Sequence, residues 1–110
     1  MIMATRTLTL RDTHPPVQIP IRLYAPEEAQ VDWICRYEIG WPDGKVERWG
    51  SGNDAVQALL GALQMIGAEI YASHYHETGR LEWLAPGRGY GFPVTNNIRD
   101  LLVGDSAERR

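Results

Sequence analysis

The sequence predicts an α+β domain of two layers, in which one long helix packs across one face of an antiparallel sheet of four or five strands. Three observations predict this fold. Apolar and polar residues alternate through much of residues 6–49, which is typical of half-buried strands. Residues 55–70 instead carry apolar side chains at helical spacing. The length of 110 residues leaves room for one such domain and not for a second.

Two strands are expected near the start of the chain, at residues 6–11 and 17–24. In the first strand, Leu8 and Leu10 alternate with polar residues. The second strand has the clearest pattern, and its apolar residues are Val17, Ile19, Ile21 and Leu23. Because Pro20 has no N–H to donate, we expect this strand at an edge of the sheet or at a bulge.

The next two strands are expected at residues 31–39 and 45–49, joined as a hairpin. Between them, residues 41–44 read Trp-Pro-Asp-Gly, which places proline and then Asp-Gly where a turn needs them. The strand at 31–39 is expected at the centre of the sheet, because one of its faces is apolar throughout. The residues of that face are Val31, Trp33, Cys35, Tyr37 and Ile39.

The helix has the strongest pattern in the chain. Ser51, Asn53 or Asp54 supplies its N-cap, since each side chain can accept a hydrogen bond from an unpaired amide of the first turn. We expect a length of about 18 to 20 residues, enough to cross a four-stranded sheet. Gly67 is expected to let the helix approach the sheet closely. The predicted buried stripe consists of Val56, Leu59, Leu60, Leu63, Ile66, Gly67 and Ile70.

A fifth strand is expected at residues 80–84, after a polar loop, and a short helix that ends at Gly104 follows it. The residues that predict this terminal helix are a cap, Thr95 or Asn96, and the apolar Ile98, Leu101 and Leu102. The predicted domain covers residues 1–104. Residues 105–110 are charged and are expected to form a disordered tail.

Composition and charge disfavour several classes of function. Lys and Arg number 11 against 14 Asp and Glu, a net charge of −3, so a broad electrostatic grip on nucleic acid or on an anionic membrane is disfavoured. The single cysteine, Cys35, excludes an intramolecular disulfide and multi-cysteine metal sites. The sequence shows no signal peptide and no apolar run of membrane-spanning length, so we expect a cytoplasmic protein without a cofactor or metal.

The glycine-rich run at residues 87–91 is the first candidate binding site. Its backbone amides could hold a phosphate, with Arg88 supplying charge, while Tyr90 and Phe92 would form a recognition edge. A glycine-rich turn without a ligand fits the same residues, because the spacings typical of nucleotide-binding loops are absent.

His74 and His76 form the second candidate site, in which they would act together with the loop at 87–91. In an extended segment an H-x-H pair points both imidazoles the same way, but two ligands do not make a metal site. A polar loop at the end of the helix explains both residues, since the helix dipole favours a charged histidine there. As nucleophiles, Cys35 and Ser51 are less favoured than as a buried inert thiol and a turn residue.

The tryptophans are the third candidate feature. Four in 110 residues exceed the needs of a small core, and Trp41 and Trp49 flank the predicted hairpin. Together with Trp83 they are candidates for a dimer or partner interface, because interface cores are enriched in tryptophan and tyrosine. An equally good interpretation places them at the edge of the core.

Several segments together resemble known sequences. They are the helical residues 54–60 and 62–69, the strand residues 6–10 and 35–39, the run Gly-Tyr-Gly-Phe-Pro at 89–93, and Ile-Arg-Asp-Leu-Leu at 98–102. On these residues the chain resembles a family of small uncharacterised bacterial proteins, a domain of unknown function. The resemblance covers nearly the whole chain. It implies a bacterial single-domain protein and transfers no catalytic residue.

The hypothesis that these patterns favour is a non-enzymatic protein-interaction module, a homodimer or a binder of another protein. Surplus aromatic residues, a possible open sheet edge and the lack of a catalytic set of residues favour it. The alternative is a small-ligand-binding protein or enzyme that uses the loop at 87–92 with Arg88 and either His74 or His76. Binding of single-stranded nucleic acid on sheet aromatics is a third hypothesis, which the net charge disfavours.

Overall fold

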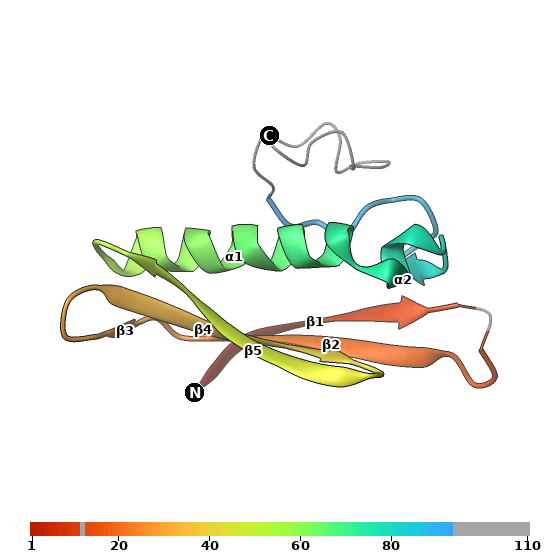
Figure 1. The fold of residues 1–110 in the computed structure, drawn as a ribbon, viewed down its shortest axis with the longest axis horizontal. Helices are drawn as coiled ribbons and strands as arrows, with labels where there is room; N and C mark the ends of the chain where they lie inside the picture. The colour runs from red at the N-terminus through yellow and green to blue at the C-terminus, as the bar shows by residue number, and fades with distance from the viewer. Residues whose placement is uncertain (12, 94–110) are drawn as a thin grey trace.

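The computed structural model describes residues 1–11 and 13–93, and this part of the chain has the predicted two-layer architecture. One long helix lies across one face of an antiparallel sheet, and a short helix follows it (Figure 1). The predicted α+β fold class is therefore confirmed. The predicted terminal helix and the predicted tail at 105–110 lie outside the described residues.

The elements follow the order that the sequence predicts, with two additions. They are β1 (Ile2–Leu10), β2 (Val17–Tyr24), β3 (Glu27–Glu28), β4 (Trp33–Trp41), β5 (Gly44–Gly52), α1 (Ala55–Ala72), α2 (His74–Glu77) and β6 (Leu81–Glu82). The short β3 was not expected, and α2 replaces a predicted loop because Ser73 caps it by accepting a hydrogen bond from the His76 amide. β1 begins before residue 6 because it pairs with the whole of β2, as far as Tyr24.

The sheet is antiparallel throughout, with the strand order β6, β1, β2, β4, β5. β3 pairs with β4 beyond the end of β2. The predicted central strand, β4, is indeed central, since it pairs with β2 and β3 on one side and with β5 on the other. β5 forms one edge of the sheet. At the other edge β6 is so short that it pairs only with Thr9 and Leu10 of β1.

The prediction that Pro20 marks an edge strand or a bulge is wrong, because β2 lies between β1 and β4. Pro20 is paired with Thr7 of β1, and the pairing of β2 with β4 begins only at Ile21. The missing N–H therefore falls at the point where the ladder to β4 ends. Opposite it, Gly40 leaves the room that the proline ring occupies, since a Cβ there would lie 3.1 Å from the ring carbons.

The helix packs on the sheet with a face that is rotated from the predicted stripe. Ile66, Gly67 and Ile70 are buried as predicted, but two other members of the stripe are exposed. Asp54 is its N-cap and accepts a hydrogen bond from the Gln57 amide. Of the predicted stripe, Val56 is 72% exposed and Leu60 is 47% exposed. The face on the sheet instead includes the small residues Ala58 and Ala62, which are fully buried.

Glycines in β5 explain this rotation of the helix. A Cβ built on Gly50 would lie 2.3 Å from the backbone nitrogen of Ala62, and one built on Gly52 would lie 2.6 Å from that of Ala58. The helix backbone therefore rests directly on the β5 backbone, and only alanines fit at the contact. Gly67, where we also expected a close approach to the sheet, is buried.

The helix α1 is unusually apolar for a surface helix. Its one charged residue, Glu69, accepts a hydrogen bond from Tyr37 and pairs with Arg48 of β5 at 3.4 Å. By length and composition α1 could span a membrane, although one face of it packs on the sheet. The apolarity of that face follows from the core. The apolarity of Val56 and Leu60 does not, because an exposed helix face in water is normally polar.

Candidate functional site

A histidine and the glycine-rich loop come together at His76 and Tyr90. The Nδ1 atom of His76 lies 2.7 Å from the Tyr90 hydroxyl, and both residues line a pocket of about 270 Å³. Its other lining residues are Gly79, Leu81, Glu82, Ala85, Gly87 and Gly89. Tyr90 is 3% exposed, and burial raises the pKa of its phenol far above the ordinary value. The Tyr71 ring packs against both side chains, at 4.9 and 5.1 Å between ring centroids.

The other predicted residues of this site lie apart from that pocket. His74 is exposed and packs on the Tyr75 ring, at 4.0 Å between centroids. The two histidines do not point the same way, because they lie in the helix α2 and not in an extended segment. Arg88 is exposed and does not line the pocket. Residues 1–11 and 13–93 contain no cluster of three or more metal-ligating side chains.

Phe92 belongs to a second cluster, centred on Arg6 of β1. The Arg6 guanidinium donates from Nη1 to the carbonyls of Tyr90 and Gly91, each at 3.1 Å. Its carbon atom lies 3.9 Å from the centroid of the Trp83 ring and 4.9 Å from that of Phe92. This cluster holds residues 90–92 against β1.

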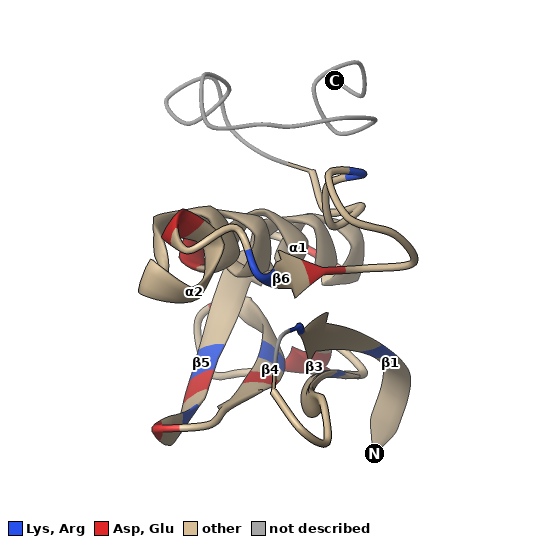
Figure 2. Cartoon of the chain, turned by 90° about the vertical axis from the view of Figure 1, so that its right-hand side faces the viewer, with Lys and Arg blue, Asp and Glu red and all other residues tan. Residues whose placement is uncertain are grey.

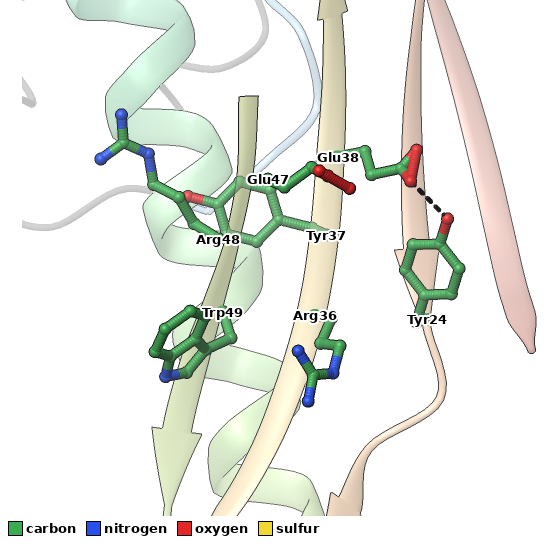
Figure 3. A pocket seen from close by; sticks show the side chains of 7 residues that line it. All are labelled: Tyr24, Arg36, Tyr37, Glu38, Glu47, Arg48 and Trp49. Atoms are coloured by element: carbon green, nitrogen blue, oxygen red, sulfur yellow. Dashed lines mark hydrogen bonds between the residues drawn. The ribbon is translucent and has the colours of Figure 1, made fainter. Parts of the chain in front are cut away.

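The three tryptophans predicted as an interface have separate environments. Trp41 stacks on Tyr75, with 5.0 Å between ring centroids and nearly parallel planes. Trp83 packs against Arg6, as described above. Trp49 is 55% exposed and lies on the face of the sheet that α1 does not cover (Figure 3). The contacts of Trp41 and Trp83 fit the interpretation that they lie at the edge of the core, and only Trp49 presents a large free surface.

Trp49 lines a pocket of about 290 Å³ (Figure 3). The lining residues come from β2, β4 and β5 and are Tyr24, Arg36, Tyr37, Glu38, Glu47, Arg48 and Trp49. The charged and phenolic groups here already have partners in the chain. Tyr24 donates to Glu38 at 2.6 Å, which raises the pKa of the Tyr24 phenol, and Arg36 pairs with Glu27 at 3.1 Å. The pocket is therefore an ion-paired surface in contact with water.

A third concave region is apolar and lies between β1 and α1. This groove has a volume of about 250 Å³. Its apolar lining residues are Ala4, Ile21, Leu23, Leu63, Ile66, Phe92 and Pro93, and Thr5, Arg6 and Gly91 complete it. The exposed Val56 and Leu60 lie on the same stripe of α1 as Leu63, because they precede it by seven and three residues. The apolar surface of the groove therefore continues along the helix.

The groove also borders an unpaired strand edge. Within the described part of the chain, β6 pairs with β1 only at Thr9 and Leu10, so no strand pairs with the outer side of β1 from Ile2 to Leu8. Ile2 and Met3, which are 48% and 45% exposed, lie at the start of this edge. We define the apolar edge site as the β1 edge from Ile2 to Leu8, the groove, and the exposed Val56 and Leu60.

Sequence reasoning missed the apolar edge site. Its residues are far apart in the chain, and the first strand was expected to begin only at residue 6. The available signal was the apolar run Met-Ile-Met-Ala at residues 1–4, which directly precedes a clear strand pattern.

The candidate nucleophile Cys35 is buried, its Sγ atom lies 3.2 Å from the Tyr24 carbonyl, and burial raises the pKa of its thiol.

The fold and the site define an α+β protein with a long, largely apolar helix on one sheet face and an open apolar edge beside it. The chain belongs to the family described as Domain of unknown function (DUF6968), whose model matches residues 4–94. This confirms the resemblance seen in the sequence. No curated protein and no solved structure matches the chain.

Proposed function

We propose that this protein is a non-enzymatic interaction module that binds an extended apolar segment of a polypeptide at the apolar edge site. The unpaired edge of β1 beside an apolar groove carries the proposal. A strand edge offers a row of free backbone donors and acceptors, and a bound strand sends alternate side chains to the helix side. At this edge such side chains meet Ala4, Leu63 and Phe92.

Electrostatics supports an apolar segment as the occupant. From residue 1 to residue 10 the chain has one charged side chain, Arg6, and its guanidinium is bound to backbone carbonyls. The nearby stripe of α1 with Val56 and Leu60 has no charge. Apolar surface that is left in water favours association by about 25 cal/mol for each Å² that a partner covers. A charged segment would lose its hydration here without gaining an opposite charge.

The test is a titration of the isotope-labelled protein with a soluble peptide of about six alternating isoleucine and threonine residues. We expect changes in amide chemical shift, and slower amide exchange, along β1 from Ile2 to Leu8 and at Leu63. A matched pair of variants tests whether binding depends on the groove side of β1. Ala4→Glu changes the groove, and Thr7→Glu changes the open face of the same strand. Ala4→Glu should weaken binding about tenfold or more, because it buries a carboxylate, whereas Thr7→Glu should not. Shift changes confined to the Trp49 pocket would contradict the proposal.

A second candidate function is the binding of a small polar ligand between His76 and Tyr90. Their hydrogen bond beside a pocket of about 270 Å³ favours it, and it retains only two of the five residues predicted from the sequence. Native mass spectrometry of the purified protein would detect a retained molecule. If such a molecule is present, His76→Ala should release it, while His74→Ala, a change outside the pocket, should leave it bound.

A further inference from the structure

We infer that the segment bound at the apolar edge site is β1 of a second copy of this chain, so that two sheets join edge to edge in a symmetric dimer. This inference rests on the proposed function, because it names the partner of the same site. β1 is itself an extended strand with several apolar side chains and one free edge, of the kind that the site binds. Pairing with its own copy satisfies the free backbone groups of both chains at once.

The positions of the residues along the edge determine how the two strands would align. Antiparallel pairing about a twofold axis normal to the sheet places one residue opposite itself. The free edge runs from Ile2 to Leu8, so its whole length is used when that residue is Thr5. Directly opposite threonines form a favourable cross-strand pair. An axis at Arg6 would instead bring two guanidinium groups together, which opposes that alignment.

With Thr5 on the axis, Arg6 of each chain faces Ala4 of the other. The small side chain of Ala4 leaves room for the guanidinium, which keeps its bonds to the carbonyls of Tyr90 and Gly91. No like charges face each other along β1, because Arg6 is its single charged residue. Self-pairing of the opposite edge is more constrained, because the charged residues Lys45, Glu47 and Arg48 lie along β5 and like charges would have to be kept apart.

A charge-exchange experiment tests this alignment. Thr5 is exposed, so a charged side chain at this position should not prevent folding. Light scattering of the unmodified protein at micromolar concentration is expected to give the mass of a dimer. Thr5→Glu and Thr5→Lys each place like charges on the axis, and each should raise the dimer dissociation constant about tenfold or more. An equimolar mixture of the two variants should recover a dimer that contains one chain of each.

The control is Lys45→Glu, a charge change on β5 that should leave the dimer unchanged. A dimer that both Thr5 variants retain would overturn the inference, because its interface would lie elsewhere. A protein that is monomeric at all concentrations would also overturn it. In that case, binding of the isoleucine–threonine peptide along β1 would leave the proposed function standing. A monomer that binds no such peptide would overturn both.

Discussion

The two edges of the sheet have opposite chemistry. β5 carries Lys45, Glu47 and Arg48 along an otherwise free edge, whereas β1 has no charge before Arg6 (Figure 2). Arg48 points to the helix side of the sheet, where it pairs with Glu69. Charged and inward-pointing residues are among the ways in which proteins prevent strand edges from pairing. β5 therefore carries features that oppose strand pairing, whereas β1 before Arg6 does not.

The edges also differ in how they are fixed to the rest of the molecule. β5 is fixed by backbone packing against α1 at Gly50 and Gly52. Apart from its pairing with β2 and the burial of Leu8 and Leu10, β1 is held to the segment at residues 90–92 by one polar side chain, Arg6. A backbone contact of this kind tolerates no added atom. A side-chain contact can be weakened in steps. Substitutions at the two edges should therefore differ in how much they lower the free energy of unfolding.

The largest effect is expected at Gly50. Gly50→Ala would place a methyl group 2.3 Å from the backbone nitrogen of Ala62, so the helix must move away from β5. We expect the free energy of unfolding in urea to fall by about 3 kcal/mol or more.

The matched control for Gly50→Ala is Gly61→Ala, on the facing helix. There the new methyl group meets the Ser51 carbonyl at 3.4 Å, an ordinary contact. Because alanine favours a helix over glycine, this variant should be neutral or more stable by up to about 1 kcal/mol. Equal losses of stability in both variants would show that the close approach of β5 to the helix does not cause the effect of Gly50→Ala.

The next largest effect is expected at Arg6. Arg6→Lys keeps the charge but removes the forked geometry that serves two carbonyls and the flat group that lies on Trp83. We expect a loss of about 1 to 3 kcal/mol in the free energy of unfolding, with faster amide exchange in the adjoining loop. Arg22→Lys is the control, because the ion pair of Arg22 with Glu38 is long, at 3.7 Å, and partly exposed. The control should change stability by no more than about 0.5 kcal/mol.

Most of the fold could be predicted because it depends on local patterns. Alternation located the long strands, and the helix and its length were anticipated, with Asp54 as one of three candidate caps. The predicted buried stripe of α1 was wrong at Val56 and Leu60, because the orientation of the helix depends on Gly50 and Gly52, which touch it only after folding. A hydrophobic stripe shows that a helix has an apolar side, but here α1 is apolar on more than one side.

The candidate site was harder to predict, because its parts meet only in space. His76 and Tyr90 were both named from the sequence, and the structure brings them within hydrogen-bond distance. Trp41 and Trp83 were grouped with Trp49 by residue type alone, although they pack on Tyr75 and on Arg6. The open edge of β1 could not be predicted from the pattern, since it depends on how few residues β6 pairs.

A comparison of two buried tyrosines gives a pH-dependent prediction. Burial and the Glu69 carboxylate raise the pKa of Tyr37, near β5, and burial raises that of Tyr90, near β1. The unfolded chain therefore ionises first, from about pH 10, and binds fewer protons than the folded chain. Above that pH the free energy of unfolding should fall by up to about 1.4 kcal/mol per pH unit for each of these residues.

The phenylalanine variants assign this loss of stability to the two sides of the molecule. Tyr37→Phe and Tyr90→Phe should each make the free energy of unfolding fall less steeply with pH. The measurement is urea unfolding between about pH 9 and pH 11, a range centred on the ordinary tyrosine pKa. Tyr24→Phe should also reduce the slope, because the hydrogen bond to Glu38 raises the pKa of the Tyr24 phenol. A slope that none of these variants changes would mean that other groups cause the loss.

The smallest effect is expected on the protected edge. Glu47 is exposed, and its pair with Lys45 is long, at 3.7 Å. Glu47→Lys should therefore change the free energy of unfolding by no more than about 0.5 kcal/mol in urea denaturation. It should also leave the solution mass unchanged, because like charges along β5 only strengthen its protection against pairing. If this variant instead altered the mass while Thr5→Glu did not, the roles of the two edges would be reversed, and β5 would be the edge that associates.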